Sequence, residues 1–190
     1  SVDNPDDTTF FSTDNTNFQV FAIRESEKSK NAYFMLTSSL GPHPFGELTS
    51  SVFFNVYNNE DWNLSVSIEP DKSGSLNFVT GSDTYGYKLK FEGYNTILGD
   101  IRDSFSLEKA LTKTQGDNFL KSAKRIYAGA YRENLTGSLI NKSDVLLSGV
   151  RYWLKNVDFD SKKQHALDFD NVGISDSYQH VSSIDPQLKN

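Results

Sequence analysis

The chain has 190 residues, which fits one domain better than two, and its 19 basic and 25 acidic residues leave a net charge of −6. No basic stripe and no apolar run of the ~20 residues needed to span a bilayer is present, so neither nucleic acid nor membrane insertion is expected. The absence of cysteine excludes disulfides and thiolate metal sites. The N-terminal "SVDNPDDTTFF" has neither the basic nor the apolar region of a signal peptide.

Alternating apolar and polar residues predict a series of short strands. Residues 1–9 are polar and acidic and predict a loose lead-in. The strands predicted after them are "FQVFAIR", "NAYFMLTS", "LTSSVFFNVYN", "WNLSVSIE" and "YGYKLKFEGYN". Aromatic residues make up 13% of the chain, a share that suits the half-buried surface of a sheet.

Because apolar residues recur at every second position, each predicted strand has one buried face and one solvent-exposed face. In "LTSSVFFNVYN" the buried face consists of Leu48, Val52, Phe54 and Val56. In "WNLSVSIE", where the alternation is cleanest, it consists of Trp62, Leu64, Val66 and Ile68. In "YGYKLKFEGYN" the aligned residues are Tyr85, Tyr87, Leu89 and Phe91.

Turns and a few helices complete the predicted elements. Glycine, proline, serine and aspartate predict tight reversals at "EPDKSG" and "TGSDTYG". Ser106 or Asp117 could cap short helices within "SLEKALTKTQGDNFLKSAK", and "DFDSKKQHALDF" predicts about two helical turns with Asp158 or Asp160 as the N-cap. Residues 174–190 are polar and patternless and predict a tail or linker.

Eight or more short strands with little helix predict an all-β fold, a two-sheet antiparallel β-sandwich over residues 10–173 with a short C-terminal helix. Within it, the small residues around Gly129 predict a close approach of the facing sheet, and Gly137 a bulge or bend. Tyr152 and Trp153 are expected to face opposite sides of a strand.

A family resemblance rests on four features in order: "NNEDWNLSVSIEP", "YGYKLKFEGYN", "RIYAGAY", and "NLTGSL" followed by "DVLLSGVRYWL". They resemble the concanavalin A-like jelly roll of the laminin G type, from about Phe18 to Gly173. The stretches "KSAKRIYAGAYRENLTGSL", "SDVLLSGVRYWL" and "QHALDFDNVG" resemble laminin G-like domains in large structural proteins of viruses, including tailed bacteriophages. The resemblance implies a jelly roll on a virion or extracellular surface.

Catalytic patterns are absent from the sequence. Glycosidases of this fold carry carboxylates two and four residues apart on one strand, and no such pattern occurs. Glu69 and Asp71 belong to the predicted "EPDKSG" loop. His43, His165 and His180 lie in a turn, a helix and the tail, and no nucleophile elbow accompanies them. We therefore predict that the chain is not an enzyme.

Calcium is the cofactor that the resemblance implies, because many concanavalin A-like domains bind it at a loop edge. Oxygen ligands could come from Asp83, Asp100, Asp103 and Asp144. The alternative is that these residues only form turns.

A sugar site needs an exposed aromatic ring beside polar groups. The loop candidates are Tyr57, Asn58, Asp83, Tyr85, Tyr87, Tyr94 and Asn95. The alternative for each tyrosine is a partly buried position in the sandwich.

Three functions follow from these observations. The first is a non-catalytic binding module of a larger, viral or phage structural protein, which recognises a glycan or another host-surface ligand. The second is an assembly or decoration domain that contacts neighbouring copies of a structural protein. The third is a polysaccharide hydrolase or lyase that uses Glu69 or Asp71.

Overall fold

The structure is a computed structural model that describes residues 18–38, 43–71, 86–121, 128–132, 139–142, 146–168 and 170. The predicted lead-in, tail and Gly137 lie outside these residues. The described part contains the following strands and helices: β1 (Gln19–Arg24), β2 (Ala32–Ser38), β3 (Gly46–Thr49), β4 (Trp62–Asp71), β5 (Gly86–Ile97), β6 (Asp100–Leu111), α1 (Lys113–Lys121), β7 (Ala130–Arg132), β8 (Leu139–Lys142) and α2 (Phe159–Leu167). Among these residues, no helix is long and apolar enough to cross a membrane.

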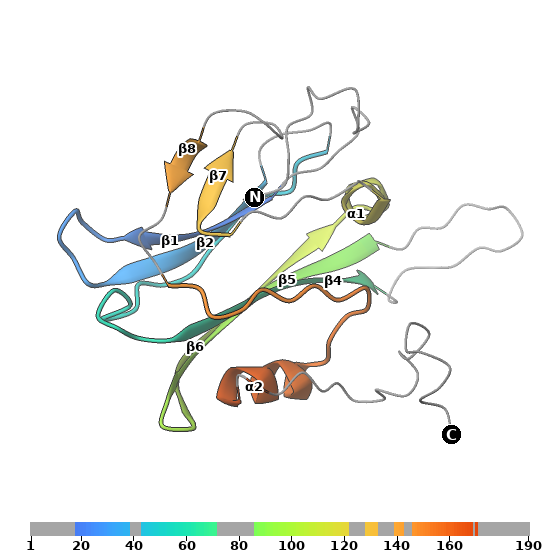
Figure 1. Ribbon diagram of the computed structural model, residues 1–190. Helices are drawn as coiled ribbons and strands as arrows, with labels where there is room; N and C mark the ends of the chain where they lie inside the picture. Colours follow the sequence, from blue (N-terminus) through green and yellow to red (C-terminus); the bar gives the residue numbers. More distant parts are fainter. Residues whose placement is uncertain are drawn as a thin grey trace, which may run out of the picture.

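The strands form two three-stranded antiparallel sheets and one separate hairpin. The sheet orders are β1-β2-β3, β4-β5-β6 and β7-β8, so each described sheet connects strands in the order of the chain. In Figure 1 the second sheet lies between β1 and β2 above it and α2 below it. The prediction of an all-β protein with two packed antiparallel sheets is confirmed at this level.

The core lies between the two three-stranded sheets. Phe34 and Leu36 of β2 meet Leu89 and Phe91 of β5, and all four are at most 2% exposed. The ring of Phe34 lies 4.6 Å from that of Trp62, centroid to centroid. Burial of such large aromatic side chains is the main favourable contribution to a sandwich of this size.

The alternation predicted for "LTSSVFFNVYN" holds only near its two ends, where Leu48 and Val56 pack against the core, and it is wrong at Val52 and Phe54. The strand β3 ends at Thr49, and Val52 and Phe54 are 42% and 72% exposed. Phe53 packs against the core instead. The chain turns over residues 54–59 with positive φ angles at Asn55 and Asn59, so the period of two breaks there.

The turn predicted at "EPDKSG" is also wrong at its start, because β4 continues through Pro70 to Asp71. Proline is tolerated since β4 is an edge strand, where a missing N–H need not break a ladder. The face of β4 that was predicted to be exposed to solvent is partly covered by helix α2. On the opposite face, Leu64 was predicted to lie in the core but is 36% exposed.

Ser106 and Asp117 do not cap helices. Ser106 lies in the middle of β6, and Asp117 lies inside α1. Thr112 takes the capping position, because its hydroxyl accepts a bond from the Gln115 N–H (3.2 Å) and the Gln115 side-chain oxygen accepts one from the Thr112 N–H (3.0 Å). This reciprocal pair is a capping box, and its sequence signal is the "TKTQ" of residues 112–115.

The predicted C-terminal helix is confirmed as α2, and of the two predicted caps Asp158 is the one used. Its carboxylate accepts a bond from the Ser161 N–H at 2.9 Å. Asp160 lies in the first turn, where a negative charge favours the helix dipole.

Gly129 is not part of a strand. It lies in a bend before β7 with φ +72°, a conformation that glycine adopts without strain. Residues 146–158 contain no strand or helix, so the strand predicted over "DVLLSGVRYWL" is wrong for the described residues. Tyr152 is 58% exposed, whereas Trp153 stacks on His165 of α2 at 5.7 Å, so the two side chains do differ as expected.

Candidate functional site

Three of the predicted ligand residues lie in a central strand rather than in loops. Tyr87, Tyr94 and Asn95 belong to β5 and are 6%, 4% and 0% exposed. They are buried because the first sheet covers one face of β5 and α2 covers part of the other. The loop positions predicted for them are therefore wrong.

Each of these residues contacts other parts of the fold. The Tyr87 hydroxyl donates to Asp117 at 2.6 Å, and the Asn95 amide donates to the backbone oxygen of Asp61 at 2.9 Å. The Tyr94 ring packs edge-on against Phe159 of α2. Burial, and then the charge of Glu92, raises the pKa of Tyr94 to about 12.

Two of the four predicted calcium residues lie in the described part of the chain. Asp83 and Asp144 lie outside the described residues, as does Tyr85. Asp100 and Asp103 lie on β6, where Asp103 is 3.7 Å from the guanidinium of Arg102. Within the described part of the chain, no three histidine, aspartate or glutamate residues are grouped as a metal would require.

Tyr57 and Asn58 lie where a loop site was predicted, in the segment of residues 50–61 that joins β3 to β4. The Tyr57 N–H donates to the backbone oxygen of Lys30 (2.9 Å) and its hydroxyl to that of Ala22 (2.7 Å). The Arg24 guanidinium lies 3.7 Å from the centre of the Tyr57 ring, a cation–π contact. Tyr57 therefore fastens this 50–61 loop to the β1–β2 hairpin.

Asparagines hold the rest of the loop in place. The Asn55 N–H donates to the Asn31 side chain (3.2 Å), and the Asn58 N–H donates to the Asn55 backbone oxygen (2.8 Å). The Asn58 side-chain oxygen accepts a bond from the Lys30 ammonium at 2.7 Å. On the inner side, Phe53 forms a β-bridge with Ala32. These contacts, most of them with residues of the β1–β2 hairpin, hold the loop in place.

Phe54 is the residue of this site that the sequence analysis placed incorrectly. It is 72% exposed, between the inward-facing Phe53 and the positive-φ Asn55. The signal was in the sequence, because three asparagines in "FNVYNNE" are turn composition, and adjacent phenylalanines in an extended segment point to opposite sides. The loop thus carries an exposed phenylalanine, with the exposed Asn58 and Asn59 four and five residues further along the chain.

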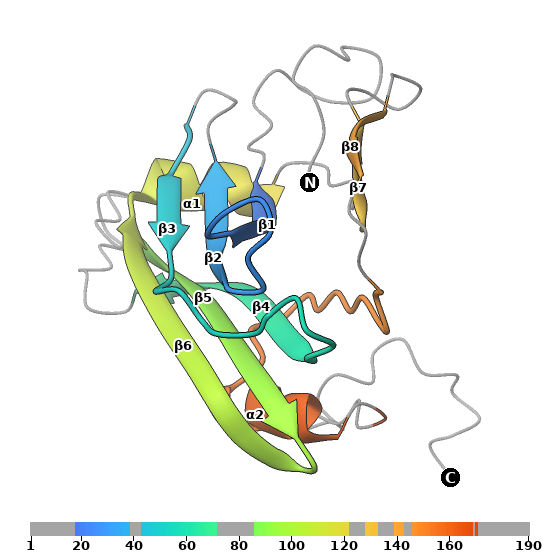
Figure 2. The same cartoon turned by 90° about the vertical axis from the view of Figure 1, so that its left-hand side faces the viewer.

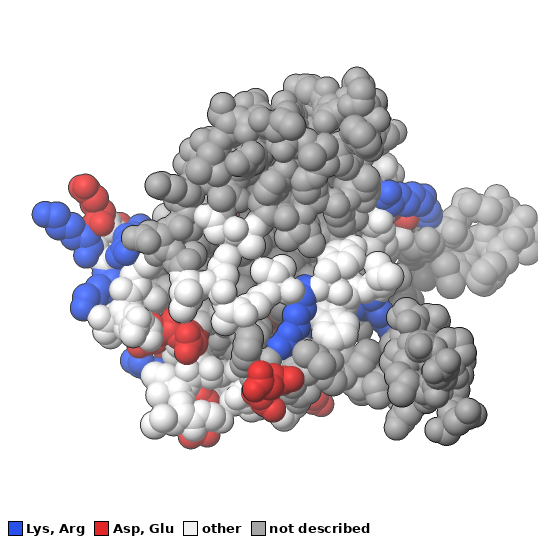
Figure 3. Space-filling model, viewed as in Figure 1, with Lys and Arg blue, Asp and Glu red and all other residues white. Residues whose placement is uncertain are grey.

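Charged side chains lie on the β1–β2 hairpin, to which this loop is fastened. In Figure 3 blue and red groups gather at the left end, where Figure 1 places that hairpin. Exposed aromatic, amide and charged groups on the loop and the hairpin offer stacking, hydrogen bonding and charge to a polar ligand.

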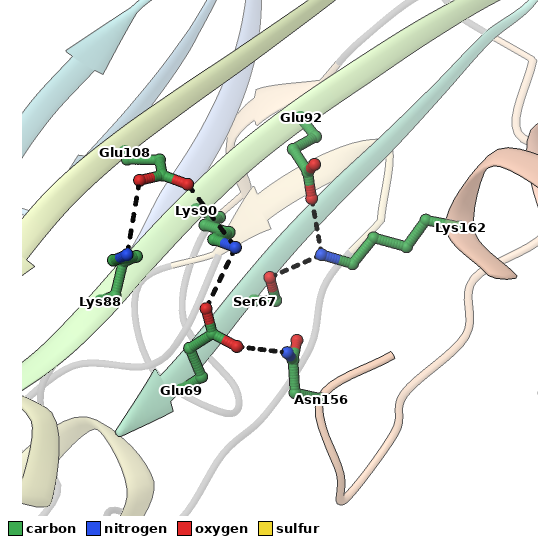
Figure 4. Close-up of polar contacts among 8 residues, drawn as sticks. All are labelled: Ser67, Glu69, Lys88, Lys90, Glu92, Glu108, Asn156 and Lys162. Atoms are coloured by element: carbon green, nitrogen blue, oxygen red, sulfur yellow. Dashed lines mark hydrogen bonds and ion pairs between the residues drawn. The ribbon is translucent and has the colours of Figure 1, made fainter. Parts of the chain in front are cut away.

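The outer face of the second sheet carries a network of ion pairs (Figure 4). Lys90 of β5 lies 3.0 Å from Glu69 of β4 and 3.5 Å from Glu108 of β6, and Lys88 lies 3.8 Å from Glu108. The hydrogen bond with Glu69 is the main reason that the pKa of Lys90 is raised. Glu69, one of the two predicted hydrolase carboxylates, also accepts a bond from Asn156 at 2.8 Å.

A buried ion pair fastens α2 to the same face. The Lys162 ammonium lies 2.6 Å from the Glu92 carboxylate, and their side chains are 9% and 4% exposed. The ammonium also donates to the Ser67 hydroxyl at 2.8 Å, so one side chain joins α2 to both β4 and β5. A buried pair with these partners serves packing and orientation.

No protein-family model matches the chain, and neither a curated protein nor a solved structure matches it. The resemblance to concanavalin A-like and laminin G-like domains therefore rests on the sequence motifs alone. The described strands agree with a two-sheet antiparallel arrangement.

Proposed function

We propose that this chain is a non-catalytic binding module that recognises a glycan, or another polar surface ligand, through the 50–61 loop. The observation that carries the proposal is Phe54, which is 72% exposed on a loop that many hydrogen bonds hold in place. The apolar face of a sugar ring can stack on an exposed aromatic side chain of this kind.

The surroundings of Phe54 suit a polar ligand. Asn58 and Asn59 are exposed, and their amides both donate and accept hydrogen bonds. Lys30 adds a positive charge beside Asn58. Because the loop is already ordered, a ligand would bind without a large entropic cost of fixing the backbone.

The proposal needs neither catalysis nor a metal. The carboxylates of the outer sheet face that are drawn in Figure 4 each contact a lysine, which suits structure better than acid–base chemistry. Asp100 and Asp103 are not grouped with a third acidic residue or histidine in the described ranges, and the other two calcium candidates, Asp83 and Asp144, lie outside these ranges.

The wider setting is also part of the proposal. The motifs from "RIYAGAY" onward favour a jelly roll of the laminin G type within a larger viral or phage structural protein, on a virion or extracellular surface. The two described antiparallel sheets support this fold as far as they go.

A glycan array tests the proposal. The labelled wild type, Phe54→Ala and the control Val52→Ala, which truncates another exposed apolar residue of the same loop, are compared in calcium and in EDTA. We expect the wild type and Val52→Ala to bind a common set of glycans, and Phe54→Ala to bind them at least ~10-fold more weakly, as for an aromatic anchor. Equal binding by all three proteins would place the site elsewhere, and a blank array under both conditions would reject glycan recognition.

A second candidate, assembly with neighbouring copies or proteins, is favoured by a different observation. Apolar residues of the irregular segment 146–158 are at least half exposed at Leu146, Leu147, Val150, Tyr152 and Leu154. A group of exposed apolar side chains is typical of protein–protein contacts. A chain that stays monomeric in light scattering and recovers no neighbour from intact particles would count against this candidate.

A further inference from the structure

The free edge of β6 is a long template for strand pairing. β6 has 12 residues and lies at the end of the sheet order β4-β5-β6. Among the described residues no strand pairs with its outer side, and Figure 2 shows β6 along the outer margin of the second sheet. Half of its backbone N–H and C=O groups therefore face away from β5, as in any edge strand.

The side chains of β6 alternate between two faces, with the odd-numbered residues less exposed than the even-numbered ones. The inner face, which packs on the core through Phe105 and Leu107, also carries Asp103 and Lys109. After the register shift at Arg102, its residues are Asp103, Phe105, Leu107, Lys109 and Leu111, whereas Ile101 pairs with Thr96 on the other face. Between residues 103 and 109 the two charges lie symmetrically about Ser106, as do the two apolar residues.

This symmetry matters if two copies of β6 lie side by side around a two-fold axis perpendicular to the sheet, because the inner faces of both copies then lie on the same side of the combined sheet. Each residue of one copy therefore faces a residue of the partner that belongs to the same face. With Ser106 on the axis, the inner pairs of residues 103–109 are Asp103 with the partner's Lys109, and Phe105 with the partner's Leu107. In this segment apolar residues meet apolar residues, and opposite charges meet.

Neighbouring registers are worse. With Phe105 on the axis, Asp103 would face the partner's Leu107. With Ser104 on the axis, Asp103 would face the partner's Phe105. On the outer face the Ser106 register places Ser104 opposite the partner's Glu108, so no like charges meet there.

We infer that β6 pairs antiparallel with β6 of a second copy of this chain, with Ser106 at the two-fold axis, to form one continuous six-stranded sheet. The paired segment, residues 103–109, is roughly 24 Å long at ~3.4 Å per residue. Its ladder supplies about seven hydrogen bonds, a number within the range of specific interfaces. The pair of Asp103 and the partner's Lys109 occurs twice and fixes the register.

A competing explanation exists for the same charges. Inward-pointing charged residues on an edge strand are also a device that prevents edge-to-edge pairing. The two explanations differ in the oligomeric state and in which residues of two copies come together.

Cysteine cross-linking separates them, because the native chain has no cysteine. Ser106→Cys would meet itself across the axis at a Cα separation of about 4.5–5.5 Å, which a disulfide can bridge. Ser104→Cys is the control: it is on the same face of the same strand and similarly exposed, but in this register its two copies are at least ~13 Å apart. We expect mild oxidation to give a disulfide-linked dimer from Ser106→Cys and none from Ser104→Cys. Equal cross-linking of both variants, or of neither, would overturn the register.

Light scattering on cysteine-free variants tests the charge pair independently. We expect the wild type to be a dimer. Asp103→Lys and Lys109→Asp each bring two like-charge pairs together and should raise the dimer dissociation constant ~10-fold or more, whereas the combined swap should restore dimers. Lys28→Asp, an exposed charge reversal on the β1–β2 hairpin, serves as the control and should remain dimeric. A wild type that stays monomeric, or a swap that fails to restore pairing in variants with wild-type circular dichroism, would reject the proposal.

Discussion

Replacement of Lys162 by methionine should be one of the most damaging single changes on the α2 side of the molecule. The variant keeps the length of the side chain but removes the ammonium that lies 2.6 Å from Glu92 and 2.8 Å from the Ser67 hydroxyl. Glu92 is 3% exposed, so its carboxylate would be left buried without its cation.

The magnitude follows from this geometry. Removal of one partner of a buried ion pair costs about 3–5 kcal/mol, because the remaining charge is uncompensated. A domain of this size is stable by about 5–15 kcal/mol, and each kcal/mol shifts Tm by roughly 2–4 °C. We therefore expect Lys162→Met to lower Tm by roughly 6–20 °C.

Urea denaturation measures the loss in the free energy of unfolding, and thermal melting measures the loss in Tm; both are followed by the fluorescence of Trp62 and Trp153. Lys163→Met is the matched control, since Lys163 is its exposed neighbour on α2 and its change should stay within about 0.5 kcal/mol. A double variant, Glu92→Met with Lys162→Met, should regain most of the stability because neither charge is then buried alone. A Lys162→Met variant as stable as Lys163→Met would refute the reasoning.

Two further predictions concern the contact between α1 and β5. Gly116→Ala would normally stabilise a helix by about 1 kcal/mol, but here the added methyl group would collide with the Tyr87 ring. We therefore expect urea denaturation to show a net loss of about 1–2 kcal/mol in the free energy of unfolding. A gain in this free energy would show that the ring moves aside. Hydrogen bonds from Lys113, and then from Tyr87, lower the pKa of Asp117 from 3.8 to about 2. Because the folded pKa is depressed, the stability that Asp117 contributes is present above pH ~4 and lost as the pH falls towards 2. The wild type should therefore be more stable than Asp117→Asn at pH 7, and the gap should narrow between pH 4 and 2; a gap that does not change with pH would contradict this.

Much of the sandwich could be predicted from the sequence because a half-buried strand has a local signature. The alternation in β5 placed Leu89 and Phe91 on one buried face, and both are in the core. The helix α2 with its cap Asp158 was also predictable, since capping depends on residues close in sequence.

The parts that could not be predicted depend on contacts that are distant in sequence. The stretch "SLEKAL" favours a helix locally, yet it forms the second half of β6 because β5 provides a complete antiparallel partner for it. Likewise, Glu92 and Tyr94 have the sequence pattern of a solvent-facing side, and only the docking of α2 buries them.

The candidate site shows the same division. Tyr57 and Asn58 were predictable as loop residues, but the alternation rule assigned Phe54 to the core, because it assumes an unbroken strand. The reversal at Asn55 has its own signal in the asparagine-rich "FNVYNNE", which the period of two obscured.

The measurement that tests the central claim most directly is the ratio of glycan binding by Phe54→Ala to binding by the wild type, on the same array and after circular dichroism has shown that both are folded. The account predicts selective binding by the wild type and a loss of at least ~10-fold in the variant. Glycan binding by Phe54→Ala at the wild-type level would contradict it.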